Sequence, residues 1–492
     1  MSTKLSAANL SRLPSSVATP RYARAELKPG IFHIGVGNFH RAHQAVYLDD
    51  LFNLGVSRDW ALVGTGVRPA DAAMRTALQS QDWLTTVVEQ EAHTKRARVT
   101  GSMIDFVAPA DAAAALAEMT KPEIRIVSLT ITEGGYYISP ATQTFDAAHP
   151  DIVADANSLN APKTAFGLIA AALKHRRDAG LKPFTVMSCD NIPGNGHVTE
   201  NAVAGLAELA HPALAAWIRT NVAFPNSMVD RITPATSDRE RNLLKEEWSV
   251  EDAWPVFCEE FKQWVIEDHF SDGRPELEKV GVTFTSEVAP YELMKIRILN
   301  GGHATIAYPA ALLDIHFVHE AMEDRQIFAF LERLTKTEIA PTVPPPPSTD
   351  LEQYRELIAR RFANPKIGDT ITRLCFDGSN RQPKFILPTV RARREAGQGV
   401  AGLALVSALW CRYCHGSSET GRAIAPNDDN WDRLQAHAKR AKDAPEAYLE
   451  MTDIFGVNAG DPEYIAAFSK ALRSLWSKGV RPTLDDYLNG RL

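Results

Sequence analysis

The sequence predicts an α/β domain followed by a mostly α-helical domain, on two observations. Short β-rich runs alternate with helical stretches in the first half of the chain, which is typical of βαβ units and a mostly parallel sheet. After about residue 286 the segments have helical periodicity instead. We therefore expect one domain over residues 1–286 and a second over residues 287–492.

The first half begins with a predicted strand at residues 31–36 and a helix at residues 40–54. Apolar, β-branched runs predict further strands at residues 60–64, 123–130 and 184–189. Alternating runs within residues 84–107 predict an antiparallel hairpin. Two later β-rich runs, at residues 221–232 and 256–267, are expected to extend the sheet or to cover its edge.

The second half is predicted to be helical because apolar residues recur there at helical spacing. The helices are expected at residues 317–339, 351–362, 401–413 and 464–476. Between the first two, the proline-rich residues 341–347 predict a stiff, extended connector.

Composition excludes several classes of protein. Lysine and arginine number 53 against 60 aspartates and glutamates, so the net charge of −7 offers no excess of cations for nucleic acid. The longest apolar run, residues 400–411, is well short of the ~20 residues that a membrane helix needs. Residues 1–20 have no signal-peptide core, so we expect a cytoplasmic protein without a membrane partner.

Five sparse cysteines are expected to be reduced thiols. Two of them, Cys411 and Cys414, form a Cys-x-x-Cys-His sequence that matches a haem-attachment or redox motif. Because this sequence ends an apolar helix and no export signal is present, we interpret both as packing residues.

A glycine motif directly follows the first predicted strand and opens a helix, at Gly35, Gly37, Asn38, Phe39 and His40. In dinucleotide-binding folds the first two glycines permit a tight turn and close approach to a pyrophosphate. Histidine replaces the third glycine of that fingerprint, so a plain strand-to-helix turn is the alternative. The βαβ context favours cofactor binding.

A carboxylate beyond the second strand would then bind the adenosine ribose. Asp71 is the candidate, with helix capping as its alternative interpretation. The neighbouring Arg68 could instead meet a 2′-phosphate, so NAD is favoured over NADP without being required.

Lys295, Asn300 and His303 share one side of a predicted helix at about 100° per residue. A solvated lysine and a capping or core histidine are the alternative interpretation. The adjacent Gly301 and Gly302 would each cost about 1 kcal/mol in a helix, which indicates that something approaches this backbone closely.

Polar residues also follow three predicted strands, where ligands of parallel sheets bind. They are Asn191, the pair Thr130 and Glu133, and Asp230, each with an ordinary turn residue as the alternative. No spacing of histidine, cysteine or carboxylate residues predicts a metal site.

Five ordered motifs together resemble the polyol-specific long-chain dehydrogenases over nearly the whole chain. They are Gly35-x-Gly37-Asn-Phe-His40-Arg41-Ala-His43, Thr130-Ile-Thr-Glu133-Gly-Gly-Tyr, Ser188-Cys-Asp-Asn191, Phe224-Pro-Asn-Ser-Met-Val-Asp230-Arg-Ile-Thr-Pro234 and Lys295…Asn300…His303. The resemblance implies a Rossmann-type N-terminal domain, a mostly helical C-terminal domain and an active site between them. It also implies NAD-dependent, zinc-independent oxidation of a secondary alcohol, with D-mannitol and D-fructose as the preferred pair.

The resemblance also implies roles for individual residues. Lys295 would be the general base, Asn191 and Asn300 the oxyanion hole, and His303 would orient the substrate. Glu292 would begin a proton path, supported by Glu133. The substrate-binding residues would be Asp230, Arg373 and Arg381, and the cofactor-binding residues would be Gly35, Gly37, Asn38, Phe39, Arg41, Asp71, Thr130 and Glu133.

Two departures from the family pattern keep alternatives open. Arg381 stands where lysine is frequent, and Ala70 stands where an acid commonly precedes the ribose-binding aspartate. The same chemistry on D-arabinitol, sorbitol or fructuronate is therefore an alternative, since Arg381 could meet a sugar carboxylate.

A catalytically inactive dinucleotide sensor is the alternative from another class. We expect a monomer, as is common for the family at this length.

Overall fold

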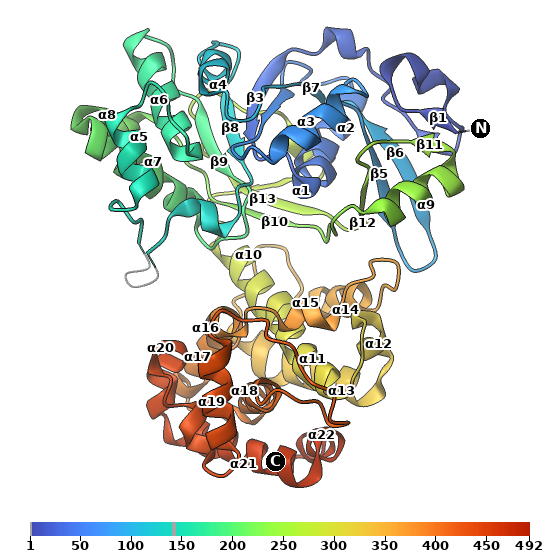
Figure 1. Ribbon diagram of the computed structural model, residues 1–492, viewed down its shortest axis with the longest axis vertical. Coiled ribbons are helices and arrows are strands. Elements are labelled where there is room, and N and C mark those ends of the chain that lie inside the picture. Colours follow the sequence, from blue (N-terminus) through green and yellow to red (C-terminus); the bar gives the residue numbers. More distant parts are fainter. Residues whose placement is uncertain (1, 140–143) are drawn as a thin grey trace. The chain divides into compact units, whose positions relative to one another are not determined.

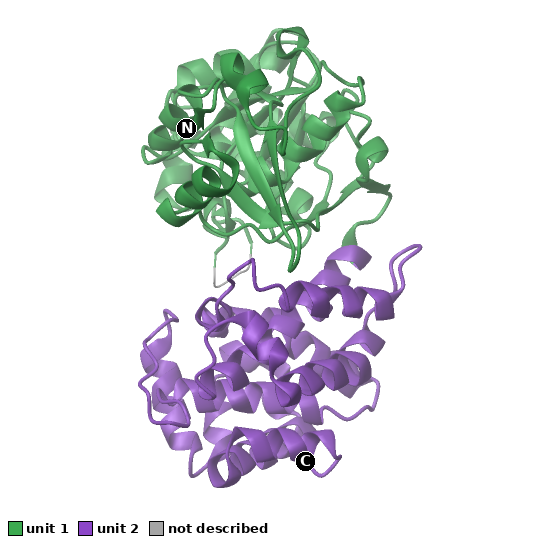
Figure 2. Ribbon diagram, turned by 90° about the vertical axis from the view of Figure 1, so that its right-hand side faces the viewer, with its two compact units in different colours: residues 1–289 green, residues 290–492 purple. Residues whose placement is uncertain are grey.

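The computed structural model describes residues 2–139 and 144–492. The chain divides into two compact units, Met1–Ala289 and Pro290–Leu492 (Figure 2). Each unit has its own hydrophobic core, and each is described separately below.

Five parallel strands form the centre of the first unit, in the order β7-β4-β3-β8-β9 (Figure 1). They are β3 (Pro29–Ile34), β4 (Ala61–Thr65), β7 (Met103–Phe106), β8 (Ile126–Leu129) and β9 (Thr185–Ser188). The strand order reverses between β3 and β8, which pair in parallel from Ile31↔Ile126 to Ile34↔Leu129. The carboxyl ends of these two strands therefore form the topological switch point, where open α/β sheets bind ligands.

Side chains of β3 alternate between two cores because successive residues of a strand point to opposite faces. Phe32 and Ile34 pack with Phe166 of α6, whereas Ile31 packs with Leu48 of α2 on the other face. Burial on both faces explains the nearly continuous apolar run of this strand. The helices that contribute to the first core are α4 (Ala112–Met119), α5 (Pro150–Asn157), α6 (Ala165–Asp178), α7 (Asn195–Ala210) and α8 (Pro212–Asn221); those on the other side are α2 (Gln44–Asn53) and α3 (Asp71–Gln79).

The helix predicted at residues 40–54 is broken at His43 into α1 (Asn38–Ala42) and α2. The His43 ring hydrogen-bonds the main-chain oxygen of Gln263 at 2.9 Å and packs edge-on against Trp264. These long-range contacts outweigh local helix propensity, which is worth only tenths of a kcal/mol per residue.

Residues 221–232 and 256–267 were expected to extend the main sheet or to cover its edge, and the first of these alternatives is wrong. Strand β10 (Ser227–Asp230) pairs antiparallel with β13 (Gln263–Glu267), and β14 (Thr283–Thr285) completes a separate sheet. Val229 and Ile266 of that sheet pack with Met187 of β9, so they cover a face of the main sheet. Sequence patterns identify strands but carry little information on which strands pair.

The predicted hairpin is confirmed as β5 (Thr85–Gln90) and β6 (Lys95–Thr100), which pair antiparallel. Strand β12 (Val256–Glu259) joins β5, and β2 (Val17–Ala18) joins β6, in a further sheet. The remaining elements of the unit are β1 (Thr3–Lys4), β11 (Val250–Glu251) and α9 (Asp238–Trp248).

The second unit is helical and surrounds α18, in which every residue from Gly402 to Cys414 is buried. Its helices are α10 (Ala289–Met294), α11 (Gly301–Leu312), α12 (Val318–Glu323), α13 (Arg325–Leu334), α14 (Leu351–Phe362), α15 (Ile371–Cys375), α16 (Gly378–Phe385), α17 (Leu387–Glu395), α18 (Ala401–Cys414), α19 (Trp431–Ala441), α20 (Thr452–Phe455), α21 (Pro462–Lys478) and α22 (Val480–Leu488). The predicted helix at residues 317–339 is interrupted at Asp324, whose carboxylate caps the start of α13. Cys411 and Cys414 are free, buried thiols, as interpreted from the sequence.

None of the helices formed by residues 2–139 and 144–492 combines the length and the apolar character required to cross a membrane.

The glycine turn after β3 gives a first testable prediction. Gly35 has a φ of +98°, and a Cβ placed on it would lie 2.1 Å from the main-chain oxygen of Thr130. Gly35→Ala should therefore lower the free energy of unfolding of the first unit by about 2–3 kcal/mol. Gly37→Ala is the matched control, because a Cβ there would meet no atom closer than 3.9 Å outside its chain neighbours. Equal melting temperatures of the two variants in calorimetry would contradict this account.

Candidate active site

The turn after β3 is tied to the end of β8. The Thr130 hydroxyl donates a hydrogen bond to the main-chain oxygen of Gly35 at 2.7 Å. Only glycine at position 35 lets the main chain lie this close to the end of β8, since a side chain there would collide with the Thr130 carbonyl. Gly35 and Thr130, two of the predicted cofactor-binding residues, are thus brought together at the switch point.

His33 supports this turn from within β3, and the sequence analysis missed it. Its Nδ1 lies 2.8 Å from the Ser128 hydroxyl and its Nε2 lies 3.1 Å from the Thr130 hydroxyl. The ring stacks on His40 with 3.5 Å between centroids. Burial lowers the pKa of His33 to about 3, so the ring is neutral. A histidine inside the apolar run of a central strand was the available signal.

Asn38 and Arg41 of α1 contact each other. The Asn38 amide donates to the Pro234 carbonyl and the Thr236 hydroxyl, and its oxygen accepts from Arg41 at 2.7 Å. Arg41 also donates to the main-chain oxygen of Trp254, and its guanidinium is fully buried, which lowers its pKa to about 10. Arg41 therefore fixes Asn38 and lies inside the protein.

Two further predicted cofactor residues flank the turn. Phe39 is half-buried and stacks on His43 with 4.8 Å between ring centroids. Asp71, at the start of α3, accepts from the main-chain N–H of Arg68 and pairs with its exposed guanidinium. The Asp71 side chain thus closes the loop after β4 beside Gly66, and the N-cap position of α3 is occupied by Ala70.

Asp190 organises the loop after β8, and this role was not predicted. Its two carboxylate oxygens accept the main-chain N–H groups of Ile131 and Thr132, both at 2.9 Å, and the hydroxyl of Tyr136 at 2.7 Å. Burial raises the pKa of Asp190 despite these bonds. The next residue, Asn191, is exposed at the carboxyl end of β9, and Glu133 is exposed in the loop that Asp190 anchors.

Asp230 ends β10 and is buried. Its carboxylate acts electrostatically on the pKa values of His43 and Tyr47 in the interior of the unit. Asp230 is therefore near the end of α1, although 187 residues separate it from His43 in the sequence (230 − 43).

In the second unit, residues Lys295–Asn300 form a π-helix between α10 and α11. The main-chain N–H of Gly301 donates to the oxygen of Ile296, five residues earlier. In an α-helix Lys295 and Asn300 would be separated by about 140° around the axis. The wide turn has more residues per turn and therefore reduces this separation, and such turns are frequent at functional sites.

Of the close approaches predicted at Gly301 and Gly302, the structure shows a tight contact at Gly302 and an ordinary van der Waals contact at Gly301, both with residues of the same unit. A Cβ on Gly301 would lie 3.4 Å from the main-chain oxygen of Phe385, and one on Gly302 would lie 3.3 Å from the Phe362 ring. These contacts press the wide turn against α14 and α16. Lys295 and Asn300 are 8% and 9% exposed, so the interpretation of Lys295 as a solvated lysine is wrong.

His303 lies one helical turn beyond Asn300. Its ring stacks on Phe362 with 4.1 Å between centroids, and its Nε2 is buried without a hydrogen-bond partner among the residues described here. Burial, together with Arg373 and two other arginines, lowers the pKa of His303 well below its usual value. His303 is therefore neutral at physiological pH.

Arg373 and Arg381 occupy consecutive short helices. Arg373 forms a two-point ion pair with Asp369, and its main-chain oxygen accepts from Arg381 at 3.2 Å. Both arginines act electrostatically on His303. The predicted substrate residues of this unit are thus brought together, and Glu292 is half-buried one turn before Lys295.

Within residues 2–139 and 144–492, no group of three or more histidine, cysteine, aspartate or glutamate residues is arranged to hold a metal ion.

Family models match both units. The model of the mannitol dehydrogenase Rossmann domain matches residues 29–279, and that of the mannitol dehydrogenase C-terminal domain matches residues 287–476. The chain belongs to the mannitol dehydrogenase family. The Rossmann-type first domain and the helical second domain expected from the sequence are confirmed.

Relatives in this family match the chain over its whole length. Mannitol 2-dehydrogenase of Cereibacter sphaeroides is 58% identical over 96% of this chain and 99% of that protein. The Pseudomonas fluorescens mannitol 2-dehydrogenase, solved as a ternary complex with NAD and D-mannitol, is 43% identical, with a TM-score of 0.88 over 99% of this chain and 100% of that one. A D-sorbitol dehydrogenase in substrate-free form is 36% identical, with a TM-score of 0.90 over 98% and 100%.

The buried histidines of this family member give a prediction for stability against pH. Burial lowers the pKa of both His33 and His43 to about 3. In the unfolded chain they protonate near pH 6.5, so the unfolded state binds more protons between pH 6.5 and 3 and stability falls as the pH falls. Each of the two histidines should lower the free energy of unfolding by about 1.4 kcal/mol for every pH unit below 6.5. Melting temperatures measured from pH 7.5 to 5.5 should therefore fall, and His33→Gln should fall less steeply. Identical slopes for the two proteins would contradict the assignment of His33.

Proposed function

We propose that this chain catalyses the NAD-dependent oxidation of D-mannitol to D-fructose and the reverse reaction. The observation that carries the proposal is the 58% identity with a mannitol 2-dehydrogenase over 99% of that protein. The complex of the Pseudomonas fluorescens relative with NAD and D-mannitol supports the same cofactor and substrate.

The residues at the switch point fit a dinucleotide. A Cβ placed on Gly37 would meet no atom closer than 3.9 Å outside its chain neighbours. This open side of the turn is where the proposal places a pyrophosphate. Thr130 fixes Gly35 beneath it, and Asp71 ends the β4 loop where a ribose hydroxyl would be bound. In the proposal Asn38 and Phe39 line the same turn, Arg41 holds Asn38, and Glu133 belongs to the neighbouring loop. When bound, NAD⁺ accepts the hydride that leaves the alcohol carbon.

Lys295 is proposed as the general base that takes the hydroxyl proton. A free lysine, with a pKa of about 10.4, is protonated at neutral pH, so a lysine base requires surroundings that disfavour the ammonium. Lys295 is 8% exposed, and its sequence neighbours Ile298 and Leu299 are buried apolar residues. Glu292, one turn earlier on the same helix, is proposed to pass the proton towards solvent.

Neutral donors are proposed to stabilise the oxygen as it becomes charged. Asn191 and Asn300 would each donate an amide N–H to that oxygen, worth about 3 kcal/mol apiece in the transition state. His303 is neutral with an unpartnered Nε2, so it can bind a substrate hydroxyl. Asp230, Arg373 and Arg381 are proposed to bind the remaining hydroxyls, and the proposal therefore draws on residues of both units.

D-Sorbitol is the second candidate substrate. The likeness to a D-sorbitol dehydrogenase, at 36% identity and a TM-score of 0.90, favours it over other polyols. The two sugars differ only in the configuration at C2, so the arrangement of Asp230, Arg373 and Arg381 would decide between them. An arginine at position 381 presents a planar fork of donors where a lysine would present a single ammonium.

Initial rates of NAD⁺ reduction test the substrate. D-Mannitol should be oxidised faster than D-sorbitol, D-arabinitol or mannonate, the reduced form of fructuronate, and the rate should be unchanged by EDTA. Faster oxidation of another polyol would support the proposed reaction and contradict D-mannitol as the substrate. Loss of activity in EDTA that added zinc restores would contradict the metal-independent mechanism. NADH binding without turnover of any of these substrates would favour the sensor alternative.

Replacement of the proposed base tests the mechanism. Lys295→Ala should lower kcat by about 10³-fold or more, because proton abstraction alone contributes about 10²–10⁴-fold. The dissociation constant for NADH, measured by fluorescence titration, should change less than twofold, since Lys295 lies outside the dinucleotide-binding unit. A matched control is Lys439→Ala, which removes an exposed lysine of α19 from the same unit and should leave kcat unchanged. Near-normal turnover of Lys295→Ala would exclude Lys295 as the base.

A further inference from the structure

A second wide turn lies against the one that carries Lys295 and Asn300. Residues Thr335–Ile339 form a π-helix after α13, and the two π-helices pack together. The Ile339 side chain lies 3.6 Å from the position of a Cβ on Gly301, immediately after Asn300. The Arg297 guanidinium, within the first wide turn, donates to the main-chain oxygen of Thr342. A shift of the second turn would therefore be transmitted to the first.

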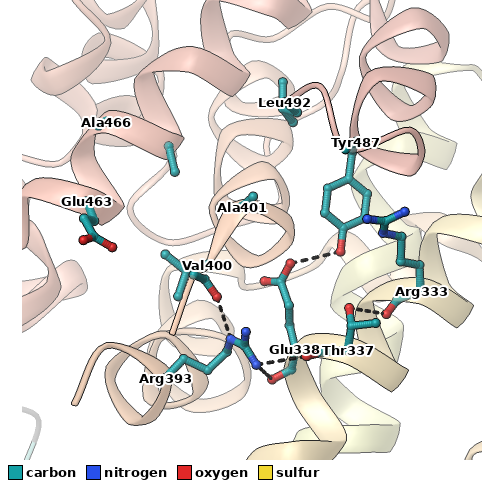
Figure 3. Close-up of a pocket in the computed structure, with 13 residues that line it drawn as sticks. Arg333, Thr337, Glu338, Arg393, Val400, Ala401, Glu463, Ala466, Tyr487 and Leu492 are labelled. Carbon is teal, nitrogen blue, oxygen red and sulfur yellow. Dashed lines mark hydrogen bonds between the residues drawn. The ribbon is translucent and has the colours of Figure 1, made fainter. Parts of the chain in front are cut away.

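The second wide turn is held by Glu338, a buried carboxylate to which no role in the reaction has been given above. One carboxylate oxygen accepts the main-chain N–H of Gly402 at 2.8 Å and the hydroxyl of Tyr487 at 3.0 Å. The other accepts the N–H of Leu403 at 3.1 Å. Figure 3 shows the Tyr487 hydroxyl directed at this carboxylate.

Glycine at position 402 leaves room for Glu338 beside α18. A Cβ there would lie 2.7 Å from the Glu338 carboxylate, 2.4 Å from the Tyr487 hydroxyl and 2.5 Å from a methyl group of Leu334. These side chains would have to shift if residue 402 carried a Cβ.

Arg393 holds the main chain of the same turn. Its guanidinium donates to the carbonyl oxygens of Thr337 at 3.0 Å and Glu338 at 3.4 Å, and to that of Gly399 at 2.7 Å (Figure 3). Carbonyls in a wide turn are displaced from regular helical partners, and a buried carbonyl needs a replacement donor. Side chain and main chain of Glu338 are thus both fixed to the α17–α18 region.

A buried carboxylate is a costly way to cap a helix. Taking the charge out of water is unfavourable, and burial raises the pKa of Glu338 even with three donors around it. A serine or an aspartate at the N-cap would satisfy the same N–H groups near solvent. Glu338 belongs to the turn that contacts Gly301 and binds that turn to the start of α18, which indicates a role beyond capping.

We propose that Glu338 is a positioning residue, which sets the wide turn Thr335–Ile339 and through it the placement of Lys295 and Asn300. This inference rests on the proposed function of those two residues. Glu338 does not contact the substrate in this proposal, and it acts through Ile339 and Gly301.

Two variants and one matched control test the proposal. Glu338→Gln replaces an acceptor with an amide group that opposes a main-chain N–H, and Tyr487→Phe removes one donor to the carboxylate. Tyr464→Phe is the control, because the Tyr464 hydroxyl makes a buried 2.9 Å bond to Ser407 on the same helix α18 without touching the wide turn. Each protein is assayed for kcat with the preferred polyol, for the pH dependence of kcat, for NADH affinity and for melting temperature.

We expect Glu338→Gln to lower kcat about tenfold and to shift the pH profile of kcat, because small displacements of catalytic groups are costly. Tyr487→Phe should have a smaller effect in the same direction. NADH affinity should stay within twofold, and Tyr464→Phe should lose thermal stability without a change in kcat. Amide hydrogen exchange of residues 295–301 should accelerate in the first two variants and not in the control.

The opposite results are distinguishable. If the wild type is active and Glu338→Gln has the same kcat, pH profile and hydrogen exchange as the wild type, the positioning role is overturned. Glu338 would then be a structural contact only. If Glu338→Gln does not fold, unchanged kcat and exchange in Tyr487→Phe would overturn it equally. Inactivity of the wild type on every polyol would overturn the proposed function, and this inference with it.

Discussion

One main-chain approach that no side chain would allow positions the candidate cofactor residues of the first unit. Gly35 lies against the Thr130 carbonyl, so the ends of β3 and β8 form one turn. Glycine costs stability in a strand, and at Gly35 that cost accompanies a position at which any other residue would collide with the main chain. In the second unit Gly301 and Gly302 lie in van der Waals contact with α16 and α14, and the side-chain ends of Glu338 and Tyr487 lie close to Gly402.

The wide turn Lys295–Asn300 shows how packing changes the geometry of a helix. Its own sequence contains no proline or glycine, and the two glycines follow it. Gly301 and Gly302 contact α16 and α14, and the second wide turn packs beside this segment. The wide turn brings Lys295 and Asn300 closer around the helix axis than the ~140° of an α-helix.

Buried polar groups lie beside the candidate site residues of both units. His33 and His43 are uncharged in the first unit, and Asp190 collects the N–H groups of the loop after β8. Such groups are costly when unsatisfied, so each restricts its neighbours to a narrow geometry. The Nε2 of His303 is one of several buried polar atoms that have no hydrogen-bond partner among the described residues.

The sequence by itself determined the two-domain organisation, the strands at β3, β4, β8 and β9, and the family, because these depend on local periodicity and on ordered motifs. It also identified Lys295, Asn300 and His303 as neighbours along one helix. Only the tertiary structure decided the break at His43, the separate sheet of β10 and β13, and the wide turn, since each results from contacts between residues far apart in the chain. For the same reason His33, Asp190 and Glu338 could not be recognised: a buried polar residue acquires its role from partners that no local pattern specifies.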